Sequence, residues 1–285
     1  MNGKEMIVRV PTSHGMFFVD VGSDKKMAGA LQNGEYPNEG LLAVARAFVN
    51  EKNVVVDIGA HIGTFAVPIA RTAGTVIAFE PSPDAFALLS RNATEHAIPL
   101  QLINKALGSR KGSGTLVTRN ASNAGANTLV AGGDIPVTTL DDEVAHADLI
   151  KIDVEGMELD VLHGGAKLIA RARPVVMFEV NLSQLRAHGA SPRALERFFT
   201  ERNYRLYVPL AQKNKLARVR SATLLTACIA PRAWLFFGES APFDLIAVPT
   251  ERPLPVSSTG FDTALLYIIK NNLLVKARRI RAYLH

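Results

Sequence analysis

An α/β fold built on a doubly wound, mostly parallel sheet is the fold class that the sequence predicts. Short apolar runs rich in β-branched residues alternate along the chain with stretches whose apolar positions recur at helical spacing. The clearest unit begins with the run Val54–Val56, which ends in Asp57. Gly59 and Gly63 follow, and apolar helix formers return at Phe65–Ala70. This order predicts a buried parallel strand, a tight turn and the start of a helix.

A second strand that ends in an acid supports the same fold. The run Thr75–Phe79 ends in Glu80, roughly twenty residues after the glycine turn, and such folds place an acid for the ribose hydroxyls at this interval. Glycines let the backbone approach a ligand closely, and open α/β sheets bind ligands at the carboxyl ends of their strands. Asp57 and Glu80 are therefore expected to line one ligand crevice.

A β-hairpin is expected ahead of this core. The apolar runs Met6–Val10 and Met16–Val21 are separated by a short stretch with Pro, Ser and Gly. A helix at Leu41–Val49 then leads into the first central strand. Tyr36 and Glu39 precede this helix. They are either an ordinary loop tyrosine and an acid at the helix start, or parts of a lid over the crevice.

The middle of the chain adds a helix, two strands and a hairpin. Pro81–Ala93 contains a capping serine, an early proline and apolar positions at helical spacing. Leu100–Ile103 is the next strand. Gly108–Gly133 is rich in Gly, Ser, Asn and Thr around short β-prone pieces, which predicts a hairpin with an exposed loop. Ile135–Leu140 is a further strand.

The later elements repeat the alternation of apolar strand and helix. They are the strand Leu149–Val154, the helix Met157–Ile169, the strand Pro174–Val180, the helix Pro192–Glu201 capped by Ser191, and the closing strands Tyr204–Val208 and Phe243–Val248. The basic stretch Ala211–Ser221 is expected to be a solvated loop. Thr263–Leu284 is expected to be a basic helix with one apolar stripe.

Size and composition indicate an ordinary globular protein. The chain has 285 residues, of which 48% are hydrophobic and 20% charged, so one main domain is expected. We divide it into an N-terminal extension (1–50), a core domain (51–250) and a tail (251–285). The net charge of +6 admits nucleic acid, an anionic membrane surface or an acidic substrate as partners, but it selects none of them.

Cysteine use and hydropathy bear on the compartment. Cys228 is the only cysteine, which excludes an intramolecular disulfide and a cysteine-based metal cluster and fits a reducing compartment. The N-terminus has no apolar signal core, and no apolar stretch is long enough to span a bilayer. A cytoplasmic location is therefore expected.

The chemistry of the crevice favours a cationic ligand. A dinucleotide site would have three glycines directly after the first strand, whereas here Asp57 precedes the turn and His61 occupies a position where a glycine often lies. A pyrophosphate would be repelled by Asp57, which suits a sulfonium and an ammonium instead. S-adenosylmethionine carries both cations and no phosphate. It therefore fits the two acids better than a nicotinamide dinucleotide does.

Several motifs together resemble the FkbM family of S-adenosylmethionine-dependent methyltransferases. They are DIGAHIGTF (57–65), FEPSPDAF (79–86), NKALGS (104–109), VTTLDD (137–142) and KIDVEGMELDVLHGG (151–165). The resemblance covers roughly residues 35–210. It implies a Rossmann-like class I methyltransferase sheet and O-methylation, with sugars and polyketide-type natural products among the acceptors. The absence of the tetrapeptide expected of amino-directed nucleic-acid methyltransferases also favours oxygen as the acceptor.

This interpretation assigns a set of cofactor-binding residues. They are Glu39, Asp57, Gly59, His61, Gly63, Thr64, Phe65, Glu80, Pro81, Ser82, Asn104 and Ala106. His61 either lines the cofactor site, caps a turn or moves a proton, and Asn104 either meets the adenine or serves the turn.

Candidate catalytic residues follow the later strands. Alternation places Lys151, Asp153 and Glu155 on one side at the carboxyl end of their strand. Methyl transfer to a hydroxyl requires a base, and Asp153 is the first candidate because Lys151 would hold it ionised. Glu155 and Glu179 are further candidates. The structural alternative for Asp153 and Glu155 is helix-start capping with a lysine–carboxylate pair.

Three hypotheses about the function remain open at this point. The first is O-methylation of a small glycosyl or natural-product acceptor, the second is ribose 2′-O-methylation of RNA, and the third is a cofactor-binding scaffold without transfer chemistry. Nucleic acid is not the expected partner. The C-terminal helix is expected to pack on its own domain or a second subunit, as in a homodimer, or to rest on an anionic membrane.

No metal is expected. Asp141 and Asp142 are adjacent and would point to opposite sides of an extended segment, and the sequence contains no histidine cluster.

Overall fold

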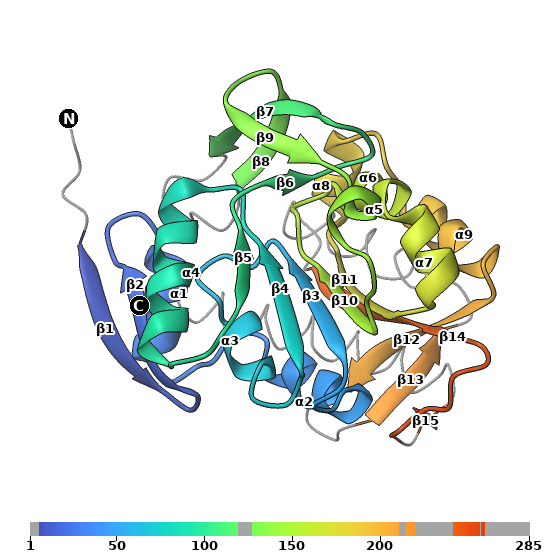
Figure 1. Cartoon of the computed structure of the whole chain (residues 1–285), viewed down its shortest axis with the longest axis horizontal. Helices are drawn as coiled ribbons and strands as arrows, with labels where there is room; N and C mark the ends of the chain where they lie inside the picture. The colour runs from blue at the N-terminus through green and yellow to red at the C-terminus, as the bar shows by residue number, and fades with distance from the viewer. Residues whose placement is uncertain (1–5, 119–126, 211–214, 220–241, 257, 260–285) are drawn as a thin grey trace, which may run out of the picture.

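The computed structural model describes residues 6–118, 127–210, 215–219, 242–256 and 258–259. A nine-stranded sheet forms its centre (Figure 1). The strands in spatial order are β15 (Ser258–Thr259), β13 (Lys215–Val219), β12 (Tyr204–Leu210), β14 (Phe243–Pro249), β11 (Val175–Val180), β10 (Leu149–Ile152), β3 (Val54–Ile58), β4 (Thr75–Phe79) and β5 (Gln101–Ile103). The predicted fold class and its central strands are confirmed.

The strand order places a switch point at the centre of this sheet. From β3 the chain moves outward through β4 to β5, and it then returns to β10 on the other side of β3. All neighbours from β5 to β11 pair in parallel, whereas β14 runs antiparallel to both β11 and β12. Ligands of open α/β sheets bind where the order reverses, which here is the shared carboxyl end of β3 and β10.

Helices cover both faces of the sheet because the buried strands are apolar on both sides. Val56 and Ile58 pack into the cluster with α5 (Leu140–Glu143), α6 (Glu158–Gly164), α7 (Ala166–Ala172) and α9 (Pro192–Thr200). Val55 faces the other cluster, formed with α2 (Glu39–Phe48) and α3 (Ala66–Ile69). Successive side chains of one strand thus point to opposite faces of the sheet and pack into two separate apolar layers.

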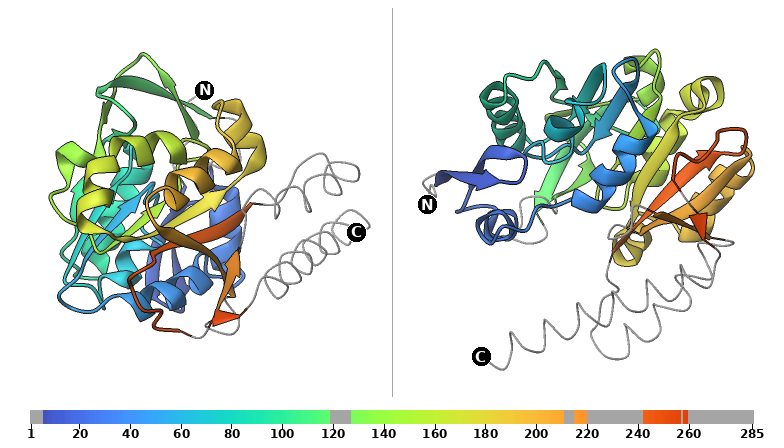
Figure 2. Two further views of the ribbon diagram at one scale, coloured as in Figure 1. Left: turned by 90° about the vertical axis from the view of Figure 1, so that its right-hand side faces the viewer. Right: turned by 90° about the horizontal axis from the view of Figure 1, so that it is seen from below.

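The predicted N-terminal hairpin is present and packs beside the core (Figure 2). It consists of β1 (Ile7–Thr12) and β2 (Gly15–Asp20) and is followed by α1 (Lys25–Gln32). Phe17 and Leu31 share an apolar cluster with Ile62 and with Leu88 of α4 (Pro83–Glu95). Asn92 of α4 exchanges two hydrogen bonds with the backbone of Phe18 and donates a third to the Ile62 carbonyl. The extension is therefore fixed to the turn after β3.

A separate four-stranded sheet stands beside the carboxyl ends of the central strands (Figure 1). Its order is β6 (Ala106–Leu107), β9 (Ile135–Thr138), β7 (Gly112–Thr118) and β8 (Asn127–Ala131). The predicted hairpin is the β7–β8 pair. The strand expected at Ile135–Leu140 ends at Thr138, since Thr139 caps α5 with a hydrogen bond from the Asp142 amide.

Two expectations for the chain are wrong in detail. The helix expected at Met157–Ile169 is divided into α6 and α7 at Gly165, where an added Cβ would lie 2.6 Å from the Leu140 side chain. Part of the expected solvated loop is the strand β13, which lies between β15 and β12 and buries Leu216 and Ala217. The short helices α1 and α8 (Leu182–Ala187) were not predicted.

The expected C-terminal helix at Thr263–Leu284 lies outside the described residues, so its packing on protein or membrane stays a prediction. Within the described ranges no helix is long and apolar enough to cross a membrane.

A buried ion pair joins the two strands at the switch point. Lys151 of β10 lies opposite Asp57 of β3 in the parallel register, and its Nζ is 3.3 Å from Asp57 Oδ1. The side chain of Asp57 is fully buried and that of Lys151 is 4% exposed. Burial raises the pKa of Asp57, and Lys151 opposes this shift. The lysine therefore allows an ionised aspartate to remain inside the sheet.

Replacing Lys151 with methionine is expected to destabilise the fold by about 3–5 kcal/mol, because Asp57 would keep a buried charge without a counterion. A carboxyl whose pKa is higher in the folded than in the unfolded chain binds a proton on folding. The loss should therefore be small near pH 5 and grow as the pH rises. Urea unfolding at several pH values measures this effect.

The exposed lysine Lys167 of α7 provides the control, since Lys167→Met removes the same charge from a solvated position. The double variant Asp57→Asn, Lys151→Met should recover most of the lost stability. Equal stability of Lys151→Met and Lys167→Met would contradict the assigned role of the pair.

Candidate functional site

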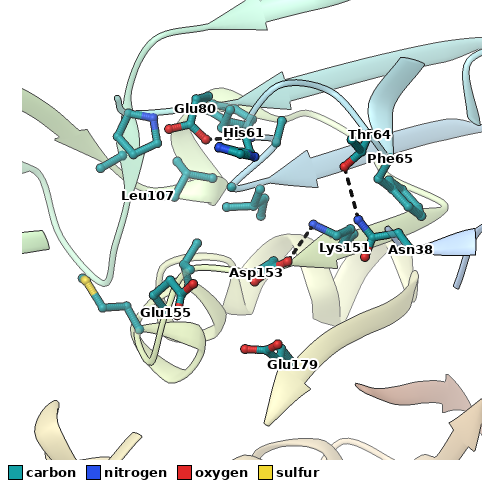
Figure 3. A pocket seen from close by; sticks show the side chains of 18 of the residues that line it. Asn38, His61, Thr64, Phe65, Glu80, Leu107, Lys151, Asp153, Glu155 and Glu179 are labelled. Atoms are coloured by element: carbon teal, nitrogen blue, oxygen red, sulfur yellow. Dashed lines mark hydrogen bonds and ion pairs between the residues drawn. The ribbon is translucent and has the colours of Figure 1, made fainter. Parts of the chain in front are cut away.

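A pocket opens at the carboxyl ends of β3, β4, β10 and β11 (Figure 3). The predicted site residues that line it are Gly59, His61, Thr64, Phe65, Glu80, Pro81, Ala106, Lys151, Asp153, Glu155 and Glu179. The pocket therefore brings candidate cofactor residues and candidate catalytic residues into one space.

The turn after β3 brings two strands into close contact. Gly59 has φ of +77°, and a Cβ on it would lie only 1.9 Å from the Asp153 carbonyl oxygen. The amides of Gly59 and Ala60 both donate to the Phe79 carbonyl at the end of β4, at 2.9 and 3.0 Å. The amide of Asp153 in turn donates to the Ile58 carbonyl at 2.9 Å. Glycine at position 59 is thus required by conformation and by space.

Glu80 is held by backbone amides from two segments. His61 N–H donates to Oε2 at 2.7 Å, and Ser82 N–H donates to Oε1 at 2.8 Å. Burial raises the pKa of Glu80, whereas nearby His61 lowers it. Each oxygen retains a further lone pair, so the carboxylate can accept hydrogen bonds from a ligand such as a vicinal diol.

Lys151 also reaches the candidate base. Its Nζ lies 3.3 Å from Asp153 Oδ2 as well as from Asp57, and the Asp153 side chain is 37% exposed (Figure 3). Burial alone would lower the pKa of Lys151, but Asp57 and Asp153 raise it above its ordinary value. Lys151 is therefore an ammonium that pairs with a carboxyl group facing the pocket.

Further acids surround Asp153. Burial together with Asp153 raises the pKa of Glu155 to about 7, and the Gln184 side-chain amide donates to the same carboxylate. Burial, Asp153 and Asp244 raise the pKa of Glu179 well above its ordinary value. Asp244 lies opposite Glu179 in the β11–β14 pair and has a pKa raised to about 6 by burial and by Asp153. This side of the pocket therefore gathers acids that disfavour one another's ionised forms.

Five predicted cofactor residues lie outside the pocket lining. They are Glu39, Asp57, Gly63, Ser82 and Asn104. Glu39 forms an ion pair with His14 at 2.7 Å, and Ser82 caps α4. Asn104 Nδ2 donates to the Glu80 carbonyl at 2.7 Å, so this residue shapes the turn that holds Glu80. Asp57 acts on the pocket through Lys151.

The two adjacent aspartates have structural contacts. Asp141 accepts hydrogen bonds from the amides of Lys167 and Leu168, and Asp142 contacts Thr139. They lie in the short helix α5 and not on an extended segment as expected. Among the described residues no group of three or more His, Cys, Asp or Glu is arranged to hold a metal ion. Metal independence stays a prediction.

Sequence reasoning missed the pocket residues that precede the core and those on the small sheet. These are Asp24, Lys26, Met27 and Ala30 near α1, Asn38 before α2, and Leu107, Leu116 and Leu129 of the small sheet. Asp24 three positions before Met27 is a helix-capping signal that could have revealed α1. The leucines had no such signal because they reach the pocket through strand pairing.

A family comparison identifies the domain. The model described as the methyltransferase FkbM domain matches residues 57–206, which is more than half of the chain. Among curated proteins, the hexuronic acid methyltransferase AglP of Haloferax volcanii is 31% identical over 121 residues. This match covers 40% of the present chain and 50% of AglP, so the chain spans about half the length of that relative.

Solved structures with similar folds share little sequence identity with the chain. The FkbM methyltransferase of Methylobacillus flagellatus is 16% identical with a TM-score of 0.42, covering 70% of this chain and 44% of that one. An rRNA methylase of Streptococcus thermophilus is 14% identical with a TM-score of 0.43, covering 74% and 94%.

The family match confirms the resemblance drawn from the motifs at 57–65 and 151–165. It also agrees with the mostly parallel sheet, whose order is that of a Rossmann-like class I methyltransferase. S-adenosyl-L-methionine is the cofactor of this family of methyltransferases. The chain therefore belongs to the FkbM family of methyltransferases.

Proposed function

We propose that this chain binds S-adenosylmethionine in the described pocket and transfers its methyl group to a hydroxyl oxygen of a small glycosyl or natural-product acceptor. The observation that carries the proposal is the position of two acids in one pocket. Glu80 lies after β4 and Asp153 lies after β10, and each is fixed by contacts from a neighbouring segment. Glu80 is placed to accept hydrogen bonds from a ribose, and Asp153 is placed to accept a proton.

The lining residues fit the parts of this cofactor. Glu80 offers lone pairs to the two ribose hydroxyls, and Gly59 allows close approach of the backbone. Leu107, Leu116 and Leu129 provide an apolar wall for a flat base. The acids around Asp153 favour a cation, as the sulfonium and the ammonium require.

The residues beyond the cofactor support transfer to a hydroxyl. When bound, S-adenosylmethionine supplies an electrophilic methyl group on a positively charged sulfur. Asp153 faces the pocket and accepts the proton of the acceptor hydroxyl, and its contact with Lys151 holds the carboxyl group in place. Glu155 is the alternative base because its pKa of about 7 lies near a neutral working pH.

The charge of the acceptor side favours an uncharged acceptor group. Asp153, Glu155 and Glu179 all line this side, and Lys151 is already shared by two carboxylates. A carboxylate or phosphate placed there would be repelled, whereas a neutral hydroxyl would not. The relative AglP is named for a hexuronic acid, which supports a glycan-type acceptor here. RNA, with its dense phosphates, fits this side less well.

S-adenosylhomocysteine is expected to bind one to one, and Glu80→Ala should weaken its binding by roughly 1–3 kcal/mol because charge-assisted hydrogen bonds are lost. Titration calorimetry measures the affinity. Glu95→Ala, on the far part of α4, removes a carboxylate outside the pocket lining and should leave the affinity unchanged. Failure of the wild-type chain to bind this ligand would disprove the proposed site.

Asp153→Asn is expected to lower the turnover number by about 10²–10⁴ with little change in S-adenosylhomocysteine affinity, because the variant keeps its shape and loses the proton acceptor. A methyl-transfer screen over neutral glycosides, natural products and RNA identifies the acceptor and supplies the assay. If Glu155→Gln abolishes transfer and Asp153→Asn does not, Glu155 is the base. If methyl transfer is detected to none of these acceptors, the hypothesis of a cofactor-binding scaffold is favoured.

Matched acceptors that differ only in charge test the role of the acids. A neutral glucoside should be methylated at least about tenfold faster than the glucuronide with the same aglycone, because each nearby carboxylate repels the uronate. Glu155→Gln should narrow this ratio, whereas Glu51→Gln, at an exposed position outside the pocket lining, should not. A preference of the wild-type enzyme for the glucuronide would show that the acceptor group is anionic.

A further inference from the structure

The N-terminal extension contributes directly to the pocket. Asp24 precedes α1 and caps it, with Oδ1 accepting the Met27 amide at 3.1 Å. Its other oxygen, Oδ2, lies 3.0 Å from Nε2 of His61 in the turn after β3. The Asp24 side chain is 4% exposed and the His61 side chain 16% exposed, so this ion pair is well shielded from water. A segment outside the core fold thus holds a side chain of the glycine turn.

His61 has an unusual backbone that needs such support. Its φ of +51° lies in the left-handed region, which costs free energy for a residue with a side chain. In this conformation the His61 amide points at Glu80 and donates to Oε2 at 2.7 Å. The ring is fixed by Asp24 and the amide by Glu80, so the three residues form one continuous chain of contacts.

We propose that Asp24 is a positioning residue for the cofactor: it holds His61 so that the His61 amide orients the Glu80 carboxylate toward the ribose. The inference rests on the proposed cofactor site. Asp24 itself touches neither the acceptor nor the transferred methyl group in this scheme. The N-terminal extension is then part of the cofactor site and not an appendage to the methyltransferase core.

The charges around His61 give the arrangement a pH dependence. The charges of Asp24 before α1, Glu80 after β4, and Asp153 and Glu155 after β10 all act on the imidazole. Burial lowers the pKa of His61, but these acids together raise it above its ordinary value. The protonated pair is therefore present at lower pH and lost as the pH rises through the raised pKa. Cofactor affinity should follow the same curve.

Asp24→Asn separates the charge of Asp24 from its structural role. Asparagine caps helices about as well as aspartate does, so α1 keeps its cap while His61 loses its counterion. Asp20→Asn is the matched control. Asp20 contacts Gly22 and Ser23 in the turn between β2 and α1, and it lies outside the pocket lining. Thermal unfolding of both variants shows whether the fold is retained.

S-adenosylhomocysteine affinity, measured by calorimetry from pH 6 to 9, is the readout. Asp24→Asn should weaken binding about tenfold at neutral pH and move the loss of affinity to lower pH, whereas Asp20→Asn should do neither. In a His61→Asn background, where asparagine tolerates the left-handed backbone but lacks the ring, Asp24→Asn should have no further effect.

Three results would overturn the inference. They are unchanged affinity in Asp24→Asn, equal losses in Asp24→Asn and Asp20→Asn, or an equal loss with and without His61. The failure of the wild-type chain to bind S-adenosylhomocysteine would instead refute the proposed cofactor site on which the inference rests.

Discussion

The close approach of the turn after β3 to the end of β10 is the constraint on which the rest of the site depends. Only a glycine at position 59 leaves room for the Asp153 carbonyl, and the Asp153 amide bonds back to Ile58. The cofactor turn and the candidate base are therefore fixed relative to each other by the backbone. Lys151 adds a second connection by pairing with an acid from each strand. Such fixed geometry is what positions an acceptor for in-line transfer.

The net charge of the whole chain does not describe the charges on each side of the pocket. The net charge is +6, yet the acceptor side of the pocket is lined by Asp153, Glu155 and Glu179. Many cations serve packing elsewhere, as when Arg202 lies over the Phe198 ring and Arg173 lies over the Tyr204 ring. The overall basic character consequently gives no reason to expect a polyanionic acceptor, and the acids of the pocket are the charges on which the proposed function rests.

Sequence reasoning succeeded where the signal is local. Val54–Ile58 and Thr75–Phe79 are apolar runs that end in acids, and both strands and the pocket position of Glu80 follow from that pattern. It could not anticipate contacts that join distant segments. Asp57 ends an apolar strand before a glycine turn, which is typical of a ligand-binding acid. Its register with Lys151, ninety-four residues away, nevertheless places it inside the sheet. Glu39 likewise contacts His14, a residue from a distant part of the sequence, and this contact is not visible in the local pattern.

The glycine turn illustrates how a local motif depends on distant support. Gly59 and Gly63 adopt positive φ readily, but His61 between them does not, and the motif alone cannot stabilise its conformation. Asp24 supplies the ring contact from α1, and Asn92 of α4 holds the next carbonyl, that of Ile62. Both supports come from outside the strand–turn–helix unit. The shape of the glycine turn is therefore a property of the packed molecule, because contacts from Asp24 and from α4 hold it as well as the sheet.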